Sequence, residues 1–388
     1  MAPMFSWLRS SSDTSSLERP LRVLFTIPSF GGGGAERVIT TLARRLNRSR
    51  FDVHLAVVNN IGPLGENLPA DMTRHSLDRK RVSQAAIPLL RLVRKVQPDV
   101  LLTASPHLNM LAGLLSPMFP RKTHLVLRET SVLARSLAAW GTGRLLLPLL
   151  AAAYRRADRV IGQSKFATQE LHDVFSVPWE RLVSIANPVE VSETVTPDSS
   201  STASPFPTDS GPHLLGVGRL HPVKGFDRAI QALPSLLQTH PHARLWLIGE
   251  GSERTQLQSL AQELGVADHL FMPGFQTDVN RWLAHADLFV LSSHSESLPN
   301  ALLEAVASSC PVVSIQHPGG TQEAVNALGL ADRWVESLTP WNDNWFTRPS
   351  PEVRERLIRK YHWQHIVSEY EQLFEEIIGH TNSRQAAA

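Results

Sequence analysis

The chain has 388 residues, of which 42% are apolar, and its formal net charge is +2. This composition excludes disordered and fibrous proteins, and the length favours two domains over one compact core. The charge is unevenly divided, because residues 1–200 hold 25 Lys and Arg against 16 Asp and Glu, whereas residues 201–388 hold 13 against 20. The basic first part is therefore suited to an anionic membrane surface, although solvated helix faces explain most such clusters.

Residues 1–20 are Ser-rich and lack the apolar core of a secretory signal, so we expect a flexible N-terminus. The most apolar segment, 145–154, is interrupted by Pro148 and is far shorter than the roughly 20 residues that span a membrane. A single cysteine, Cys310, excludes an internal disulfide. These features predict a cytoplasmic protein with no nucleic-acid partner, with peripheral contact to the inner face of the plasma membrane through its basic part.

Residues 21–190 alternate short apolar runs with longer helical patterns, as parallel sheets with crossover helices do. The expected strands are 21–27, 53–58, 99–104, 123–129, 158–164 and one ending at 185–188, and the expected helices are 34–47, 82–96 and 144–156. Six strands make a complete doubly wound unit, which predicts an N-terminal Rossmann-like domain. Residues 191–212 then carry ten Ser or Thr and four Pro without apolar periodicity, which predicts a flexible linker.

A second alternation of the same kind fills residues 213–350. Its expected strands are 213–218, 244–249, 269–274, 287–293 and 311–315, and its expected helices are 224–238, 253–264 and 299–307. A long amphipathic helix over 351–378 and a tail over 379–388 close the chain. Two doubly wound units in tandem predict an α/β protein whose ligand site lies in a cleft between the carboxyl ends of their strands.

The first strand-to-helix turn contains four consecutive glycines, of which Gly33 and Gly34 lead into the expected helix. Glycine lets the backbone approach a ligand closely, and the amides at the helix start attract an anion. A dinucleotide-binding turn needs Gly or Ala three residues after Gly33, where this chain has Glu36. The turn therefore favours a phosphate-bearing ligand other than NAD.

Two cations, Arg219 and Lys224, follow the first strand of the second unit and lead into its first helix. Two positive charges in a cleft suit a diphosphate, because they neutralise the charge that grows on a departing nucleotide without a metal ion. No D-x-D sequence occurs in the chain, so a carboxylate-held divalent cation is unsupported. We therefore expect neither a metal site nor a cofactor.

The segment 294–313 places Glu296 in a loop and Glu304 about two turns into the helix that begins near Pro299. Proline is favourable at a first helical position, and the open amide of Asn300 is expected to face an anion. A glutamate in a loop can reach the hydroxyls of a sugar, while a glutamate in a helix can accept hydrogen bonds from the two hydroxyls of a ribose.

Two further features are candidates for the same cleft. Gly319 and Gly320 repeat the strand, glycine turn and helix design, so they are expected to bring another backbone near the ligand. His107 follows the strand 99–104 and is a candidate to face the sugar, although a histidine at a helix start more often caps or packs.

Taken together, the motifs resemble retaining GT-B glycosyltransferases of the glycosyltransferase family 4 type. The resemblance covers nearly the whole chain, through GGAERV (33–38), LRET (127–130), IANPVE (185–190), GVGRLHPVKG (216–225), LIGEGSE (247–253), FMPGF (271–275) and the E-x7-E pair Glu296 and Glu304. It implies two Rossmann-like domains facing a cleft and a C-terminal helix that crosses back to the first domain. It also implies a nucleotide-sugar donor, most often a UDP-sugar, and a glycan or lipid-linked acceptor that binds the N-terminal domain.

The resemblance assigns roles to matching positions. Arg219 and Lys224 hold the donor diphosphate near Gly33 and Gly34, Glu304 holds the ribose, and Glu296 holds the transferred sugar. Phe275 lies near the base, and the donor site is completed by Ser297, Leu298 and Asn300. The expected catalytic residues are Glu296, Arg219, Lys224 and His107.

The chain departs from the family pattern at several places. Ser297, Ser308 and Ser309 stand where the family commonly has Gly, Cys and Gly. Ser297 is expected to crowd the sugar site, which leaves the donor sugar open. The Trp-rich residues 332–346 replace the usual segment before the closing helix, and the sequence gives no physical account of them.

Retention of the anomeric configuration without a positioned carboxylate nucleophile predicts a metal-independent front-face attack. In this mechanism the acceptor hydroxyl enters from the same side of the sugar as the departing nucleotide. Three other functions stay open at this point. They are a nucleotide-sugar epimerase of similar fold, a non-catalytic nucleotide-sugar-binding regulator and, disfavoured by Glu36, an NAD-dependent oxidoreductase.

Overall fold

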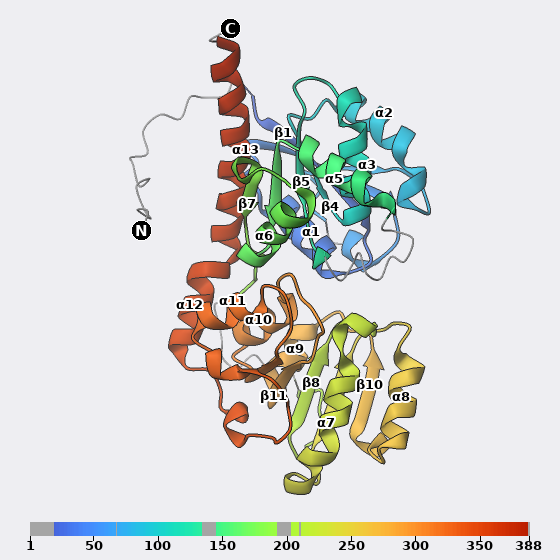
Figure 1. The fold of residues 1–388 in the computed structure, drawn as a ribbon, viewed down its shortest axis with the longest axis vertical. Coiled ribbons are helices and arrows are strands. Elements are labelled where there is room, and N and C mark those ends of the chain that lie inside the picture. Colours follow the sequence, from blue (N-terminus) through green and yellow to red (C-terminus); the bar gives the residue numbers. More distant parts are fainter. Residues whose placement is uncertain (1–18, 67, 134–144, 192–202, 209–210, 387–388) are drawn as a thin grey trace.

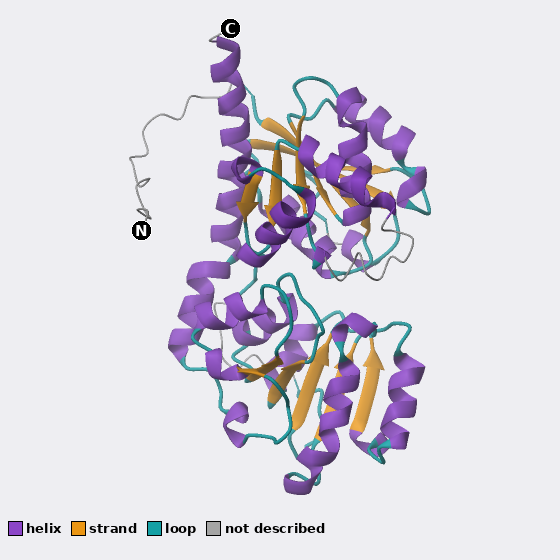
Figure 2. Cartoon of the chain, in the orientation of Figure 1, coloured by secondary structure: helices purple, strands orange, loops and turns teal. Residues whose placement is uncertain are grey.

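The computed structural model describes residues 19–66, 68–133, 145–191, 203–208 and 211–386, with the side chains of 380–386 left out. Residues 1–18 of the predicted flexible N-terminus and most of the predicted linker lie outside these residues. The described chain forms two domains, each a parallel sheet flanked by helices (Figures 1 and 2).

The N-terminal domain is built on a seven-stranded parallel sheet with the order β3-β2-β1-β4-β5-β6-β7. The strands are β1 (Leu21–Ser29), β2 (Phe51–Asn59), β3 (Thr73–Ser76), β4 (Val100–Ala104), β5 (His124–Arg128), β6 (Arg159–Gly162) and β7 (Leu182–Ser184). The prediction of six strands missed β3, which reads Thr-Arg-His-Ser and is largely exposed. An exposed edge strand has no apolar face to bury, so its sequence carries no strand periodicity.

Two helical layers cover this sheet. One face packs against α1 (Gly34–Arg45) and α13 (Trp363–Ala386), and the other against α2 (Ala86–Val96), α3 (Pro106–Leu115), α5 (Leu147–Arg156) and α6 (Lys165–Phe175). The apolar residues of α1 and α2 recur with helical spacing, which places one buried stripe of each helix on the sheet.

The C-terminal domain has a six-stranded parallel sheet with the order β10-β9-β8-β11-β12-β13. Its strands are β8 (His213–Val217), β9 (Arg244–Ile248), β10 (Leu270–Gly274), β11 (Leu288–Leu291), β12 (Val312–Ile315) and β13 (Trp334–Val335). Its helices are α7 (Phe226–Thr239), α8 (Arg254–Glu263), α9 (Val279–His285), α10 (Asn300–Ala307), α11 (Thr321–Leu328) and α12 (Pro351–Tyr361). The order reverses beside β8 in this sheet and beside β1 in the other, so both sheets are doubly wound, as predicted.

Part of the predicted linker is packed. Phe206 is 4% exposed, stacks on His213 with the ring centroids 4.5 Å apart, and meets Trp246 and Trp282 edge-on. The apolar side chain of Phe206 is the one strong burial signal among the polar residues around it, and it anchors this stretch to the C-terminal domain.

The Trp-rich segment also packs on the C-terminal domain. Trp334 belongs to β13, which pairs with β12 at the edge of the sheet. Trp345 is buried against Trp341, whose indole Nε1 donates to the carbonyl of Ala232 in α7 at 2.9 Å. The segment therefore covers one face of the sheet and completes the domain core.

The closing helix, predicted as one element, consists of α12 and α13. His362, between them, has φ −59° and ψ 139°, which breaks the helix where the chain passes between domains. Val189, on the first passage between the domains, donates to the carbonyl of Tyr361 and accepts from the amide of Trp363, at 2.8 and 3.1 Å. α13 then packs on the N-terminal sheet, as predicted, with Phe374 in its core.

Ser309, one of the three departures from the family pattern, is strained. Its φ is 56°, in the left-handed region that glycine adopts freely. We expect Ser309→Gly to raise the free energy of unfolding by about 1 kcal/mol. Urea unfolding would show this gain, and Ser308→Gly is the matched control, because Ser308 has φ −84° and gains nothing from glycine.

Candidate functional site

A cleft of about 1920 Å³ lies between the carboxyl ends of the two sheets. Every residue that the sequence nominated for the donor site lines it, and so does His107 at the start of α3. The donor-site residues in question are Gly33, Gly34, Arg219, Lys224, Phe275, Glu296, Ser297, Leu298, Asn300 and Glu304. Residues far apart in the sequence thus share one cavity because parallel strands end at the same edge of each sheet.

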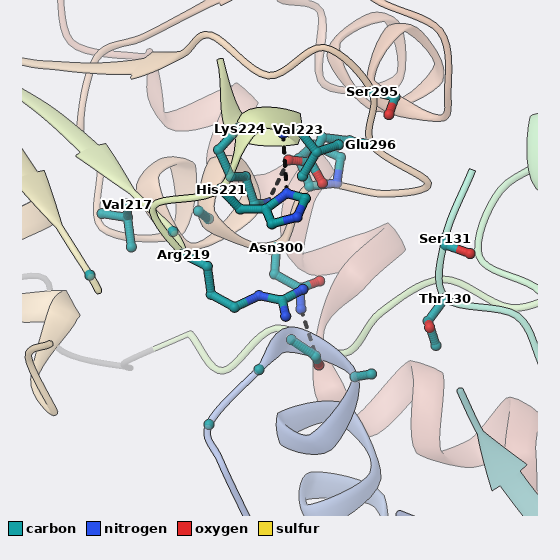
Figure 3. Close-up of a pocket in the computed structure, with 18 of the residues that line it drawn as sticks. Thr130, Ser131, Val217, Arg219, His221, Val223, Lys224, Ser295, Glu296 and Asn300 are labelled. Atoms are coloured by element: carbon teal, nitrogen blue, oxygen red, sulfur yellow. Dashed lines mark hydrogen bonds and ion pairs between the residues drawn. The ribbon is translucent and has the colours of Figure 1, made fainter. Parts of the chain in front are cut away.

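Lys224 and Glu296 form an ion pair inside the cleft (Figure 3). The ammonium Nζ of Lys224 lies 2.7 Å from Oε1 of Glu296, which also accepts a hydrogen bond of 2.7 Å from the hydroxyl of Ser293. The side chains of the pair are only 24% and 13% exposed, so solvent screens their two charges weakly. Lys224 ends the short turn Pro222–Lys224, and Gly225, with φ 57°, turns the chain into α7.

Arg219 follows β8 and extends toward Asn300 at the start of α10 (Figure 3). The helix start leaves amides of α10 open to the cleft, and the guanidinium adds a fixed positive charge beside them. This corner of the cleft is therefore suited to a doubly charged anion such as a diphosphate.

The loop that carries Glu296 is held in place by glycines of the next turn. Gly319 has φ 132° and pairs with Glu296 in an isolated parallel bridge, and the amide of Gly320 donates to the carbonyl of Glu296 at 2.9 Å. The sequence predicted that these glycines approach the ligand, whereas in the structure they approach the backbone of residue 296 and are not among the residues that line the cleft. Their role is to position Glu296.

A Cβ atom at Gly319 would lie 1.8 Å from the carbonyl oxygen of Glu296. We therefore expect Gly319→Ala to displace the Glu296 loop. It should lower the free energy of unfolding by at least about 1 kcal/mol more than the strain of a positive φ alone would. Gly265→Ala is the matched control, because Gly265 has φ 69° with no atom within 4 Å of its Cβ position. Urea unfolding of both variants separates the two costs, and equal losses would contradict the positioning role.

Glu304 sits on α10 and faces the N-terminal domain. Burial raises the pKa of its carboxyl group, and Arg37 of α1, 3.7 Å away, partly offsets this effect. Arg37 was not nominated from the sequence, because nothing in the chain near residue 37 shows that another domain supplies its partner.

Asn300 joins the two domains at the floor of the cleft. Its amide Nδ2 donates to the carbonyl of Gly34 at 3.4 Å, and its Oδ1 accepts from the amide of Asn187. A side chain at residue 34 would meet Asn300 Nδ2 at 2.8 Å, so the glycine allows this close approach. Asn187, like Arg37, is a contact between domains that sequence reasoning missed.

Ser297 is buried at the same interdomain contact. Its carbonyl accepts from the hydroxyl of Ser164 at 3.0 Å, and its φ is not positive, so serine fits this backbone without strain. Among the described residues, its own hydroxyl has no hydrogen-bond partner. Leu298 next to it is buried, whereas the ring of Phe275, at the end of β10, is 46% exposed and free to stack on a flat ligand group.

The part of the N-terminal cleft wall that follows β5 was not nominated from the sequence. Arg128, Thr130 and Ser131 line it at the end of β5 (Figure 3 shows the last two). The buried carboxylate of Glu129 holds this turn, accepting from the amides of Thr130 and Ser131 at 2.8 Å each and from the hydroxyl of Tyr154. The position of LRET (127–130) at the carboxyl end of a strand was the signal that could have found it.

Within the described part of the chain, no three His, Cys, Asp or Glu side chains are grouped as metal ligands. Over the same residues, no helix is both long and apolar enough to cross a bilayer.

Two family models match the chain, one for each domain. The model "Glycosyltransferase Family 4" matches residues 32–193, and "Glycosyl transferases group 1" matches residues 203–336. The chain is a GT-B glycosyltransferase of the family 4 type. Both matches cover the strand-to-helix turns that build the cleft, so the predicted fold class and the predicted transferase class are confirmed.

Two curated relatives are named as glycosyltransferases. The chain is 27% identical to N-acetylgalactosamine-N,N'-diacetylbacillosaminyl-diphospho-undecaprenol 4-alpha-N-acetylgalactosaminyltransferase of Campylobacter jejuni, over 76% of this chain and 81% of that protein. It is 32% identical to the lipopolysaccharide core biosynthesis glycosyltransferase LpsE of Rhizobium meliloti, over 43% of this chain and 46% of that protein. The second match therefore spans less than half of that relative.

Solved structures share the fold of this glycosyltransferase. HepE of Anabaena, in complex with UDP, superposes with a TM-score of 0.71 at 18% identity, covering 92% of this chain and all of that one. Sucrose-phosphate synthase of Thermosynechococcus elongatus gives 0.73 at 17% identity, covering 93% and 100%. At these identities the likeness shows the architecture alone.

Proposed function

We propose that this glycosyltransferase moves a sugar, with retention of the anomeric configuration, from a UDP-sugar to a glycan or lipid-linked acceptor. The single observation that carries the proposal is the convergence of Arg219, Lys224, Glu296 and Glu304 in one interdomain cleft. The two cations complement a diphosphate, and the two carboxylates can accept hydrogen bonds from the hydroxyls of the ribose on one side and of the sugar on the other.

The reaction is proposed to need no resident metal. The acceptor hydroxyl attacks the anomeric carbon from the side on which the nucleotide leaves, as the bond from that carbon to the β-phosphate oxygen breaks. The departing phosphate oxygen takes the hydroxyl proton, and Arg219 and Lys224 neutralise the charge that develops on the diphosphate. Glu296 orients the transferred sugar through its hydroxyls, Glu304 holds the ribose diol, and His107 faces the sugar from the N-terminal domain.

Support for UDP and for the acceptor class comes from related proteins. HepE has been solved with UDP and with UDP-glucose, and the Campylobacter relative is named for an undecaprenol-linked acceptor. The proposed setting is the cytoplasmic face of the membrane, with peripheral contact through the basic N-terminal domain. In this setting the acceptor reaches the wall formed by Thr130 and Ser131.

A thermal-shift screen of UDP-, GDP- and ADP-sugars tests the donor, because a ligand that binds only the folded state raises the melting temperature. Product analysis by NMR then tests the reaction, with an α-linked product expected from an α-linked donor. Free epimerised sugar without an acceptor would show an epimerase. Donor binding without turnover against any acceptor class would show a regulator.

A further inference from the structure

The starts of α1 and α10 meet across the cleft, one from each domain. Asn300 of α10 donates to the carbonyl of Gly34 of α1 at 3.4 Å, a contact that Figure 3 marks with a dashed line. One turn further along each helix, Nη1 of Arg37 lies 3.7 Å from Oε1 of Glu304, and both side chains line the cleft. A cation of the N-terminal domain is thus placed beside the carboxylate to which the proposed function gives the ribose.

This ion pair has no competing partner. Among the residues that the structure describes, neither Arg37 nor Glu304 makes another ion pair or side-chain hydrogen bond. Their side chains are 32% and 25% exposed, so solvent screens the two charges only in part. Burial raises the pKa of the Glu304 carboxyl group, and the charge of Arg37 acts in the opposite direction. Removal of Arg37 therefore leaves a half-buried carboxylate whose charge nothing nearby balances.

The length of the ion pair leaves room for a ligand. A charge-assisted hydrogen bond between nitrogen and oxygen measures about 2.7–2.9 Å, so Arg37 attracts Glu304 at 3.7 Å without hydrogen-bonding to it. An ionised carboxylate offers about four acceptor positions. Glu304 therefore keeps its acceptor positions for the two ribose hydroxyls while its charge is balanced from the other domain.

A guanidinium in this cleft could instead bind the diphosphate directly. The corner that suits a diphosphate lies at the start of α10, where Arg219 extends toward Asn300. Arg37 points elsewhere, because its guanidinium lies against Glu304, one turn further along α10. The geometry favours action through Glu304 over direct contact with phosphate.

We propose that Arg37 is a positioning residue for ribose recognition, which balances the charge of Glu304 and orients its carboxylate toward the ribose hydroxyls. Because the two residues belong to different domains, recognition of the ribose depends on both domains although only Glu304 touches it. The inference deepens the proposed function and rests on it for the role of Glu304.

Isothermal titration calorimetry of the full chain with UDP and with 2′,3′-dideoxy-UDP, which lacks both ribose hydroxyls, tests the proposal. We expect Arg37→Met to weaken UDP binding by about three- to tenfold and to change binding of the dideoxy nucleotide by less than about twofold. Arg37→Lys should restore most of the affinity for UDP, because at 3.7 Å the charge is needed and the forked guanidinium is not. In a Glu304→Gln protein, Arg37→Met should cost no further affinity.

Arg45→Met is the matched control, because Arg45 lies on the same helix and pairs with Glu190 at 3.2 Å outside the cleft. It should bind both nucleotides as the unmodified protein does. In turnover of the donor identified by the thermal-shift screen, Arg37→Met should raise KM and leave kcat near its original value, because the ribose is remote from the bond that breaks.

Equal losses for UDP and for the dideoxy nucleotide would overturn the inference, in favour of direct contact between Arg37 and the diphosphate. A lower kcat with an unchanged KM would also overturn it. Either result leaves the proposed function standing. Failure of UDP to bind the unmodified protein would instead contradict the proposed donor, and this inference with it.

Discussion

Lys224→Ala should lower the turnover number by about 10² to 10³, the usual loss when one preorganised group that stabilises a leaving charge is removed. The Nζ of Lys224 lies 2.7 Å from Glu296 in the cleft, and both side chains are largely buried. Water that fills the space left by alanine therefore cannot supply the electrostatic stabilisation that the ammonium group gives. UDP release from the donor that the thermal-shift screen identifies measures the effect. Turnover near that of the unmodified protein would end the assignment of Lys224.

A second variant separates two causes of such a loss. Without Lys224, the carboxylate of Glu296 keeps the hydroxyl of Ser293 but loses its counter-charge and repels the diphosphate. If repulsion alone lowers the rate, adding Glu296→Gln to Lys224→Ala restores it, whereas loss of the cation predicts no recovery. Lys95→Ala, on the exposed end of α2, is the matched control and should leave UDP release unchanged.

The sequence was sufficient to predict the two doubly wound sheets and the crossover, because buried parallel strands and amphipathic helices leave strong periodic patterns. It missed β3, whose four residues are polar and largely exposed at the sheet edge. It also joined α12 to α13, because the break at His362 follows from the passage of the chain beside Val189 and not from a Gly or Pro. In both cases, the edge strand and the helix break, the structure is set by contacts with segments that are distant in the sequence.

The same distinction applies to the site. Residues such as Arg219 and Glu304 could be nominated from the sequence because each lies at or just after a strand-to-helix turn, and such turns gather at one edge of a sheet. Arg37 and Asn187 could not, since their partners Glu304 and Asn300 belong to the other domain. The positioning role of Gly319 was hidden for the same reason, as its φ and its neighbour become visible only in three dimensions.

Arg128→Ala should lower the free energy of unfolding by about 3 to 5 kcal/mol. Arg128 is one of the largest fully buried side chains of the protein, and its guanidinium connects three parts of the chain. From β5, its Nε donates to the hydroxyl of Tyr370 on α13 at 2.9 Å, and its Nη2 donates to Asn187, which in turn bonds Asn300. Alanine leaves a cavity and removes the donors of both partners, so burial and hydrogen bonding are lost together.

Arg128→Met separates these two losses, because methionine fills much of the volume but makes neither hydrogen bond. It also removes a buried charge for which no carboxylate among the described residues lies within ion-pair distance, so it should cost less than alanine. Urea unfolding measures both variants, and Arg91→Ala, exposed on α2, should stay within about 0.5 kcal/mol of the unmodified protein. If Arg128→Ala costs no more than Arg91→Ala, the buried guanidinium does not hold the domains together. If methionine costs as much as alanine, the hydrogen bonds to Tyr370 and Asn187, and not the filled volume, carry the stabilisation.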